Sequence, residues 1–287
     1  MQDNDYYIIN IKLSERLAIL PGISFFRYAD VQARVRARIG AMPDEARWHY
    51  VADASDLDNL IERMRSNGLS HWVADLPRSP DTNTIEGSLR QHLLNLLDNV
   101  GRLLPNRWIG VKRWLYLASN LVWVQRLLTE ADIEPPEQID AMLKPIFSLH
   151  IDERSKRLEQ TPYHQYLSTS SPFDRWLSDF TASCPSVSGR EAYVLRRLAK
   201  SILRHRTRIL DLRKQANTNN TADLTAQWRL RDELTRELRG LIGGDPFHVG
   251  LVLIYCLLEL LQYERCRAFL VARSCGWERP EILGSTA

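Results

Sequence analysis

Residues 191–212, EAYVLRRLAKSILRHRTRILDL, carry the pattern that decides the fold class. The apolar residues of one face recur at intervals of three and four, at Leu195, Leu198, Ile202, Ile209 and Leu212, with His205 at the remaining place. This spacing is that of an α-helix, and so narrow a stripe is typical of a helix packed against other helices. We therefore predict one long helix here, and we expect His205 to be a hydrogen-bonded core residue rather than a ligand.

The segments on either side show the same helical spacing. Val31, Val35 and Ile39 recur every fourth residue, which predicts an amphipathic helix over 26–40. Ser55 can cap a further helix that ends at Gly68. Other helices are predicted over 85–100, 108–128 and 224–242, with a polar loop at 217–221. The fold class is therefore predicted to be all-α, with a single helical body over 26–287.

The first 25 residues form a separate, variable segment in this interpretation. Tyr7–Ile11 is a β-branched run that can form a short strand, and residues 20–22 then break the chain. The start is acidic where a signal peptide is basic, so we expect a cytoplasmic protein. The most apolar run, Val249–Leu261, contains Glu259 and is shorter than the roughly 18 residues that indicate a membrane span.

Composition and missing motifs narrow the function classes. The chain has 287 residues, 44% of them hydrophobic and 25% charged, as in ordinary globular proteins. Its 38 Lys and Arg against 35 Asp and Glu give a formal charge of +3, which argues against nucleic acid as a partner held by charge alone. The sequence has no Walker-type phosphate loop, no nucleophile elbow, and no His or Cys pattern with metal-ligand spacing. We therefore expect no catalytic site, no cofactor and no metal.

One stretch departs from this even charge. Between Arg190 and Lys214, nine cationic side chains stand against two acidic ones, and nine minus two leaves a local charge of +7. Two interpretations stay open. In the first, a cationic helix face that includes Arg204, Arg206 and Arg208 docks on an acidic partner, RNA or lipid headgroups. In the second, the face is solvated and acidic groups elsewhere in the fold balance its charge.

A short pattern recurs three times along the chain. It consists of a capping residue, a proline, an aromatic ring and, four residues after the ring, a leucine, and it begins at Thr161, Ser171 and Asp245. A ring and a leucine at that separation touch on one helix face. The pattern is either an internal repeat or the shared chemistry of good helix starts.

Two segments far apart in the chain resemble one known family. Asp245-Pro246-Phe247 begins a helix that reaches Tyr255, and Arg267 follows that tyrosine by twelve positions. Near the other end, Ala33-Arg34-Val35-Arg36-Ala37-Arg38 precedes Gly40. In this order the motifs resemble those of the C subunit of bacterial and archaeal V/A-type ATPases, whose eukaryotic counterpart is the d subunit.

The resemblance implies a funnel-like bundle of helices, built from three related helical units as a pseudo-threefold repeat. Such a protein sits on the cytoplasmic mouth of the proteolipid ring and receives the central stalk in its open side. It carries torque between an ATP-hydrolysing head and an ion-moving ring, without a catalytic site. On this basis we expect a non-catalytic rotor subunit, peripheral at the cytoplasmic face of the membrane, whose partners are the central-stalk subunits and the proteolipid ring.

Charged residues of these motifs and of the basic stretch are the candidate partner-binding residues: Arg34, Arg36, Arg38, Arg204, Arg206, Arg208, Glu264, Arg267 and Arg273. We expect the arginines of 34–38 to brace neighbouring helices. Glu264 and Arg267 lie three apart and can pair on their own helix. Two other functions stay open: a free-standing helical scaffold, and an RNA-binding protein that uses the helix over 190–214.

Overall fold

The computed structural model describes residues 21–102, 104, 108–118, 120–135, 139–164, 189–219, 224–242 and 250–277. Every regular element among these residues is a helix, and they contain no strand, which confirms the all-α prediction. The strand predicted for Tyr7–Ile11 lies outside the described residues. The elements are, in chain order, α2 (Pro21–Ala41), α3 (Glu45–Ala52), α4 (Leu57–Met64), η1 (Arg65–Leu69), α5 (Ser70–Val73), α6 (Thr82–Gly101), α7 (Ile109–Ala118), α8 (Leu121–Thr129), η3 (Lys144–Ile146), α9 (Ile151–Leu158), α12 (Gly189–Asn219), α13 (Leu224–Gly240) and α14 (Gly250–Ser274).

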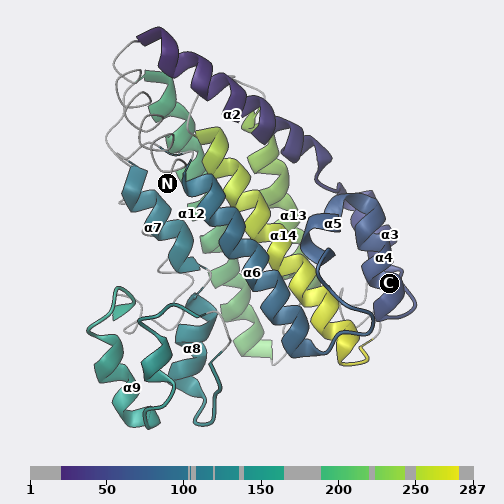
Figure 1. The fold of residues 1–287 in the computed structure, drawn as a ribbon, viewed down its shortest axis with the longest axis vertical. Coiled ribbons are helices and arrows are strands. Elements are labelled where there is room, and N and C mark those ends of the chain that lie inside the picture. The colour runs from purple at the N-terminus through teal and green to yellow at the C-terminus, as the bar shows by residue number, and fades with distance from the viewer. Residues whose placement is uncertain are drawn as a thin grey trace, which may run out of the picture.

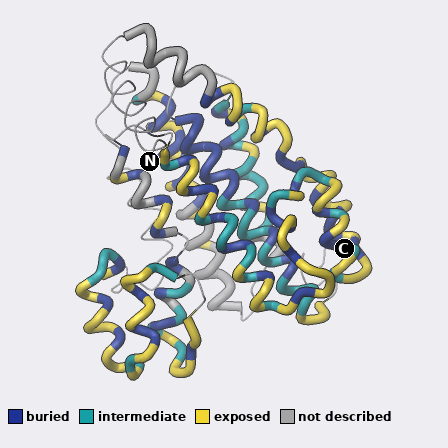
Figure 2. The backbone as a smooth tube through the Cα atoms, in the orientation of Figure 1, coloured by how far each residue is buried: buried dark blue, intermediate teal, exposed yellow. Residues whose placement is uncertain are grey.

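Helix α14 is the centre of the bundle. It packs against α2, α4, α6, α12 and α13, and α6 runs beside it (Figure 1). Every residue from Gly250 to Glu259 is buried, so the most apolar run of the sequence forms the innermost part of the core (Figure 2). Neighbours on several sides explain why this run has no polar face. None of the described helices combines the length and the apolarity that crossing a membrane requires.

Two smaller groups of helices flank the bundle. One consists of α3, α4 and α5 near the described end of α14, and the other consists of α8, η3 and α9 at the opposite side (Figure 1). The second group is held together by Arg154, which is only 3% exposed. Its guanidinium donates hydrogen bonds to five backbone carbonyls, those of Leu127, Glu130, Ala131, Phe147 and Leu149. A buried arginine of this kind is tolerated because its donors are satisfied.

Two helix starts differ from their predicted positions. Helix α2 begins at Pro21, ahead of the predicted Phe26, because proline needs no amide partner in the first turn of a helix. The N-cap of α4 is Asp56 rather than Ser55: Oδ1 of Asp56 accepts a hydrogen bond from the amide of Asn59 at 2.8 Å. The hydroxyl of Ser55 instead donates to Oδ2 of Asp56 at 2.7 Å. The serine therefore supports the cap and does not form it.

Two segments also differ in length. The predicted helix over 108–128 is divided into α7 and α8, which meet around Asn120. Helix α12 runs to Asn219 and so includes the first part of the predicted polar loop at 217–221. At this division the fully buried Asn120 accepts a hydrogen bond from the buried guanidinium of Arg90 on α6.

The funnel shape, the threefold repeat and the single body over 26–287 stay predictions. Of the three proline-aromatic patterns, only the one at Thr161–Tyr163 begins among the described residues. There Oγ1 of Thr161 accepts a hydrogen bond from the amide of Tyr163 at 3.2 Å, as expected of a capping residue. The pattern that begins at Ser171 and the first three residues of the one that begins at Asp245 lie outside the described part of the chain.

Candidate functional site

A chain of polar side chains crosses the core where α2, α14, α5 and α6 meet. We call it the core polar chain, and it consists of Arg38, Tyr255, Glu259, His71 and His92. Arg38 donates from Nη1 to the hydroxyl of Tyr255 at 3.4 Å, and its guanidinium carbon lies 6.0 Å from the centre of that ring. Tyr255 in turn is hydrogen-bonded to Glu259, one turn further along α14.

Glu259 is the buried centre of this chain. Its side chain is 3% exposed, and Oε2 lies 3.5 Å from Nε2 of His71 on α5. The rings of His71 and His92 are 5.2 Å apart, and the ring of Trp72 lies edge-on to His92 at 4.6 Å. The Nε2 atoms of both histidines and Oε2 of Glu259 are buried without a hydrogen bond among the described residues. Three helices thus bring ionisable groups together around a buried carboxylate.

Burial sets the protonation of the groups around Glu259. Loss of solvent lowers the pKa of His92, and the neighbouring His71 lowers it further, while the carboxyl of Glu259 acts in the opposite direction. Burial raises the pKa of Tyr255 well above its ordinary value, and Glu259 adds to this effect. Burial likewise raises the pKa of Cys256. These groups stay uncharged near neutral pH, so the arrangement is better suited to holding helices together than to supplying a nucleophile.

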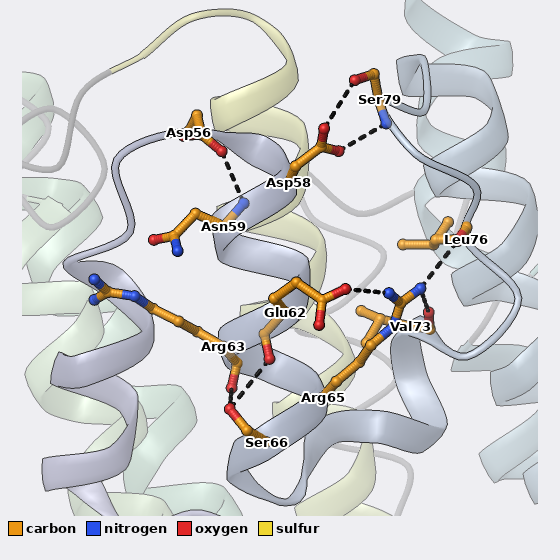
Figure 3. A network of polar contacts seen from close by, with 10 residues as sticks. All are labelled: Asp56, Asp58, Asn59, Glu62, Arg63, Arg65, Ser66, Val73, Leu76 and Ser79. Atoms are coloured by element: carbon orange, nitrogen blue, oxygen red, sulfur yellow. Dashed lines mark hydrogen bonds and ion pairs between the residues drawn. The ribbon is translucent and has the colours of Figure 1, made fainter.

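The segment that carries His71 is fixed by a second polar network (Figure 3). Asp58 on α4 accepts hydrogen bonds from the amide of Ser79 at 2.8 Å and from its hydroxyl at 3.1 Å. Arg65 in η1 donates to the carbonyl of Leu76 at 3.2 Å. The loop between α5 and α6 is therefore tied to α4, which sets the position of α5 relative to α14.

The arginines predicted on α2 partly serve as internal braces. Arg36 donates from Nη2 to the backbone carbonyl of Ile242 at the end of α13, at 3.2 Å. Arg38 contacts Tyr255 on α14, as described above. Arg34 is exposed. The predicted bracing role therefore has a direct counterpart in Arg36 and Arg38.

The charged residues predicted on α14 pair with other helices. Glu264 lies 2.8 Å from Nη2 of Arg231 on α13, and Arg267 lies 2.6 Å from the carboxylate of Glu86 on α6. Their spacing also allowed a pair between Glu264 and Arg267 on one helix, but each forms its ion pair with a residue of a neighbouring helix. Arg273 donates to the carbonyl of Ala54 at 2.7 Å, outside the bundle core.

Two of the three arginines predicted on α12, Arg204 and Arg208, pair with acidic residues of α13. Arg204 lies 2.8 Å from Glu237, and Arg208 forms an ion pair with Glu233. For these two residues, acidic groups elsewhere in the fold do balance the charge. The side chain of Arg206 lies outside the described part of the structure.

His205 lies between these two pairs and is 8% exposed, which confirms its predicted place in the core. Burial lowers its pKa to about 4, and the nearby Arg231 lowers it as well.

A further cluster has no counterpart among the predicted residues. The guanidinium of Arg265 lies 4.6 Å from the ring centre of Trp48 and 5.5 Å from that of Trp228, and it pairs with Asp232 at 2.9 Å. Cation–π contacts of this kind join α3, α13 and α14. Sequence reasoning also missed His71 and the role of Glu259, although a carboxylate inside the most apolar run is a recognisable signal.

Comparison of the chain with models of protein families, with characterised proteins and with solved structures gives no match.

Proposed function

We propose that this chain is a non-catalytic rotor subunit of a V/A-type, ion-translocating ATPase, which connects the central stalk to the proteolipid ring. One observation carries the proposal. The two segments that resemble this ATPase family lie far apart in the sequence, and the hydrogen bond from Arg38 to Tyr255 joins them in the fold. Residues of both segments therefore belong to one packed junction between α2 and α14, as expected if the two motifs serve one structural purpose.

The contacts between the helices are suited to transmitting torque. A torque-carrying adaptor has to resist sliding of its helices, and close-packed interiors are nearly incompressible. Around α14, ionic and polar contacts to α2, α6 and α13 supplement the apolar core, through Arg38, Arg267 and Glu264. These contacts fix the register of α14 relative to α2, α6 and α13, because sliding one helix along another would break them.

The proposed place is the cytoplasmic face of the membrane, where the chain is peripheral. This part of the proposal rests on the family resemblance. It agrees with the absence of a membrane-crossing helix among the described residues.

Affinity purification from gently solubilised membranes tests the proposal. The tagged full-length chain should retain both proteolipid and central-stalk subunits. The variant Arg38→Gln should retain less of both, because it removes the contact to Tyr255. Arg47→Gln is the matched control, since Arg47 is exposed and its side chain makes no described contact. Recovery of the wild-type chain alone, from extracts in which a tagged ring protein still retains the stalk, would overturn the proposal.

The two alternatives predict different results. A free-standing helical scaffold has the same bundle but retains neither the ring nor the stalk in the purification above. RNA binding through 190–214 has less support, because Glu237 and Glu233 already engage Arg204 and Arg208. Tight RNA binding at physiological salt, lost when these arginines become glutamine, would favour that alternative.

A further inference from the structure

The first half of α12 presents one outward face, which we call the cationic stripe. It consists of Tyr193, Arg196, Arg197, Lys200 and Leu203, and all five are exposed. At about 3.6 residues per turn and about 1.5 Å per residue, they form a single stripe roughly 15 Å long. The opposite face of the same turns is buried, at Val194, Leu195, Leu198, Ala199 and Ile202. The stripe is therefore the solvent side of a helix that is already packed on its other side.

Two large apolar side chains mark the ends of the stripe. Tyr193 is 54% exposed and Leu203 is 39% exposed, and both are among the most exposed large apolar side chains of the described residues. Between them stand three cations. This composition, with aromatic residues and arginine beside an apolar anchor, is typical of the residues that dominate protein–protein interfaces.

None of the three cations pairs with a carboxylate among the described residues. Nε of Arg196 donates to the carbonyl of Ala192 in its own helix, at 3.2 Å. The guanidinium of Arg197 lies 5.8 Å from the ring centre of Tyr193. Lys200 is exposed and forms no ion pair within the described part of the chain. Within the described residues, the positive charge of these turns therefore has no carboxylate to balance it.

The next turns of the same helix differ in this respect. Arg204 and Arg208 are paired with Glu237 and Glu233 of α13. Acidic residues of α13 thus neutralise Arg204 and Arg208, whereas the three cations of the stripe have no carboxylate partner among the described residues. A face of this length and charge fits a partner of similar length that carries carboxylates.

We propose that the cationic stripe docks an acidic amphipathic helix from another protein chain. Carboxylates spaced three and four residues apart on such a helix would face Arg196, Arg197 and Lys200, and apolar residues between them would cover the two anchors. The proposal does not rest on the rotor assignment, because it needs only the stripe and its missing counter-charges.

A phosphate backbone fits this surface less well than a helix does. Glu237 and Glu233 already engage Arg204 and Arg208, so these two arginines are not free to extend the stripe for a longer phosphate chain. Three cations release few counterions, which limits the affinity for nucleic acid at physiological salt. Leu203 is also an apolar anchor for which a nucleic-acid backbone has no counterpart.

Binding of a designed helical peptide to the full chain tests the proposal. The probe is a fluorescent peptide of about 15 residues with glutamates at i, i+3, i+4 and i+7 beside a leucine stripe, and its partner probe has glutamine in place of glutamate. Fluorescence anisotropy should show that the acidic peptide binds the wild-type chain at least about tenfold more tightly than the glutamine peptide. The triple variant R196E/R197E/K200E should lose at least about tenfold in affinity for the acidic peptide, as expected for reversal of steering and contact charges.

A matched control separates this surface from net charge. The variant R47E/R78E/K156E changes the net charge by the same amount at three exposed positions elsewhere, and it should bind the acidic peptide within about threefold of the wild type. The variant Y193S/L203S, which keeps every charge, should also weaken binding. Circular dichroism establishes that each variant is folded. Equal losses in the two charge variants, or tighter binding of a single-stranded RNA or of phosphatidylserine vesicles than of the peptide, would overturn the proposal.

Discussion

The imidazole of His71 on α5 lies beside the buried carboxylate of Glu259 on α14, and the two form an ion pair when the histidine is protonated. Nε2 of His71 lies 3.5 Å from Oε2 of Glu259, and the carboxylate is 3% exposed whereas the imidazole is 36% exposed. A buried carboxylate that loses its partner keeps its desolvation cost without compensation. The partly exposed His71 therefore offsets part of the desolvation cost of burying the Glu259 carboxylate.

The His71–Glu259 pair gives a prediction for a double-mutant cycle. His71→Phe keeps an aromatic ring but leaves Glu259 unpaired, and it should lower the free energy of unfolding by about 1–3 kcal/mol. Adding Glu259→Gln to that variant should restore part of the loss, so that the two changes are coupled by at least about 0.5 kcal/mol. Urea unfolding at pH 6 measures all four proteins. Purely additive costs would show that the two side chains do not stabilise one another.

His205 predicts a dependence of stability on pH. Its pKa in the folded chain is about 4, below the ordinary 6.5, so the unfolded chain binds more protons between these values. Its contribution is fully present above about pH 6.5 and declines as the pH falls toward 4, by on the order of 3 kcal/mol. His205→Gln should show a shallower decline in urea unfolding over this range. His49→Gln, at an exposed position, should follow the wild type, and an equal change of slope in both variants would contradict the assignment.

At Gly68, we predict that a side chain is not tolerated. Its φ is +82°, and a Cβ there would lie 2.5 Å from the carbonyl oxygen of Ala41. Gly68→Ala should therefore destabilise the protein by about 1–3 kcal/mol. Gly87→Ala is the control, because Gly87 lies in α6 with nothing within 4 Å of an added Cβ, and it should stabilise by about 0.5–1 kcal/mol. Thermal unfolding distinguishes the two signs.

At Arg265, we predict that replacement by lysine lowers the stability of the fold. The planar guanidinium lies over Trp48 and Trp228 while it pairs with Asp232, and an ammonium group cannot keep all three contacts. Arg265→Lys should lower the free energy of unfolding by about 1–2 kcal/mol. Arg229→Lys, at an exposed position of α13, should change it by less than about 0.5 kcal/mol. Similar effects of the two variants in urea unfolding would refute the role of the aromatic contacts.

The positions of the long helices could be predicted from the sequence, because the residues that a helix buries on one face recur every three or four positions. The apolar stripe of α12 and the spacing in α6 follow directly from which face lies on the core. The break between α7 and α8 left no such trace. A buried contact between Arg90 and Asn120 lies at this break, and the partner on α6 cannot be identified from the α7–α8 segment alone.

The candidate site was less predictable than the fold, for a related reason. The pairings of Glu264 with Arg231 and of Arg267 with Glu86 join residues of different helices. Spacing along one helix could not distinguish a pair within that helix from these contacts, because it contains no information on which helix lies opposite. The core polar chain likewise needs α5 and α6 to approach Glu259, which only the tertiary structure determines.

The central position of α14 also bears on the order of events during synthesis. Helix α6 leaves the ribosome long before α14 exists, although the two pack side by side in the finished bundle. Until then, the leucines of α6 that belong to their shared interface have no native cover, and such nascent surfaces attract chaperones or aggregate. The bundle therefore closes only after its innermost helix has been made.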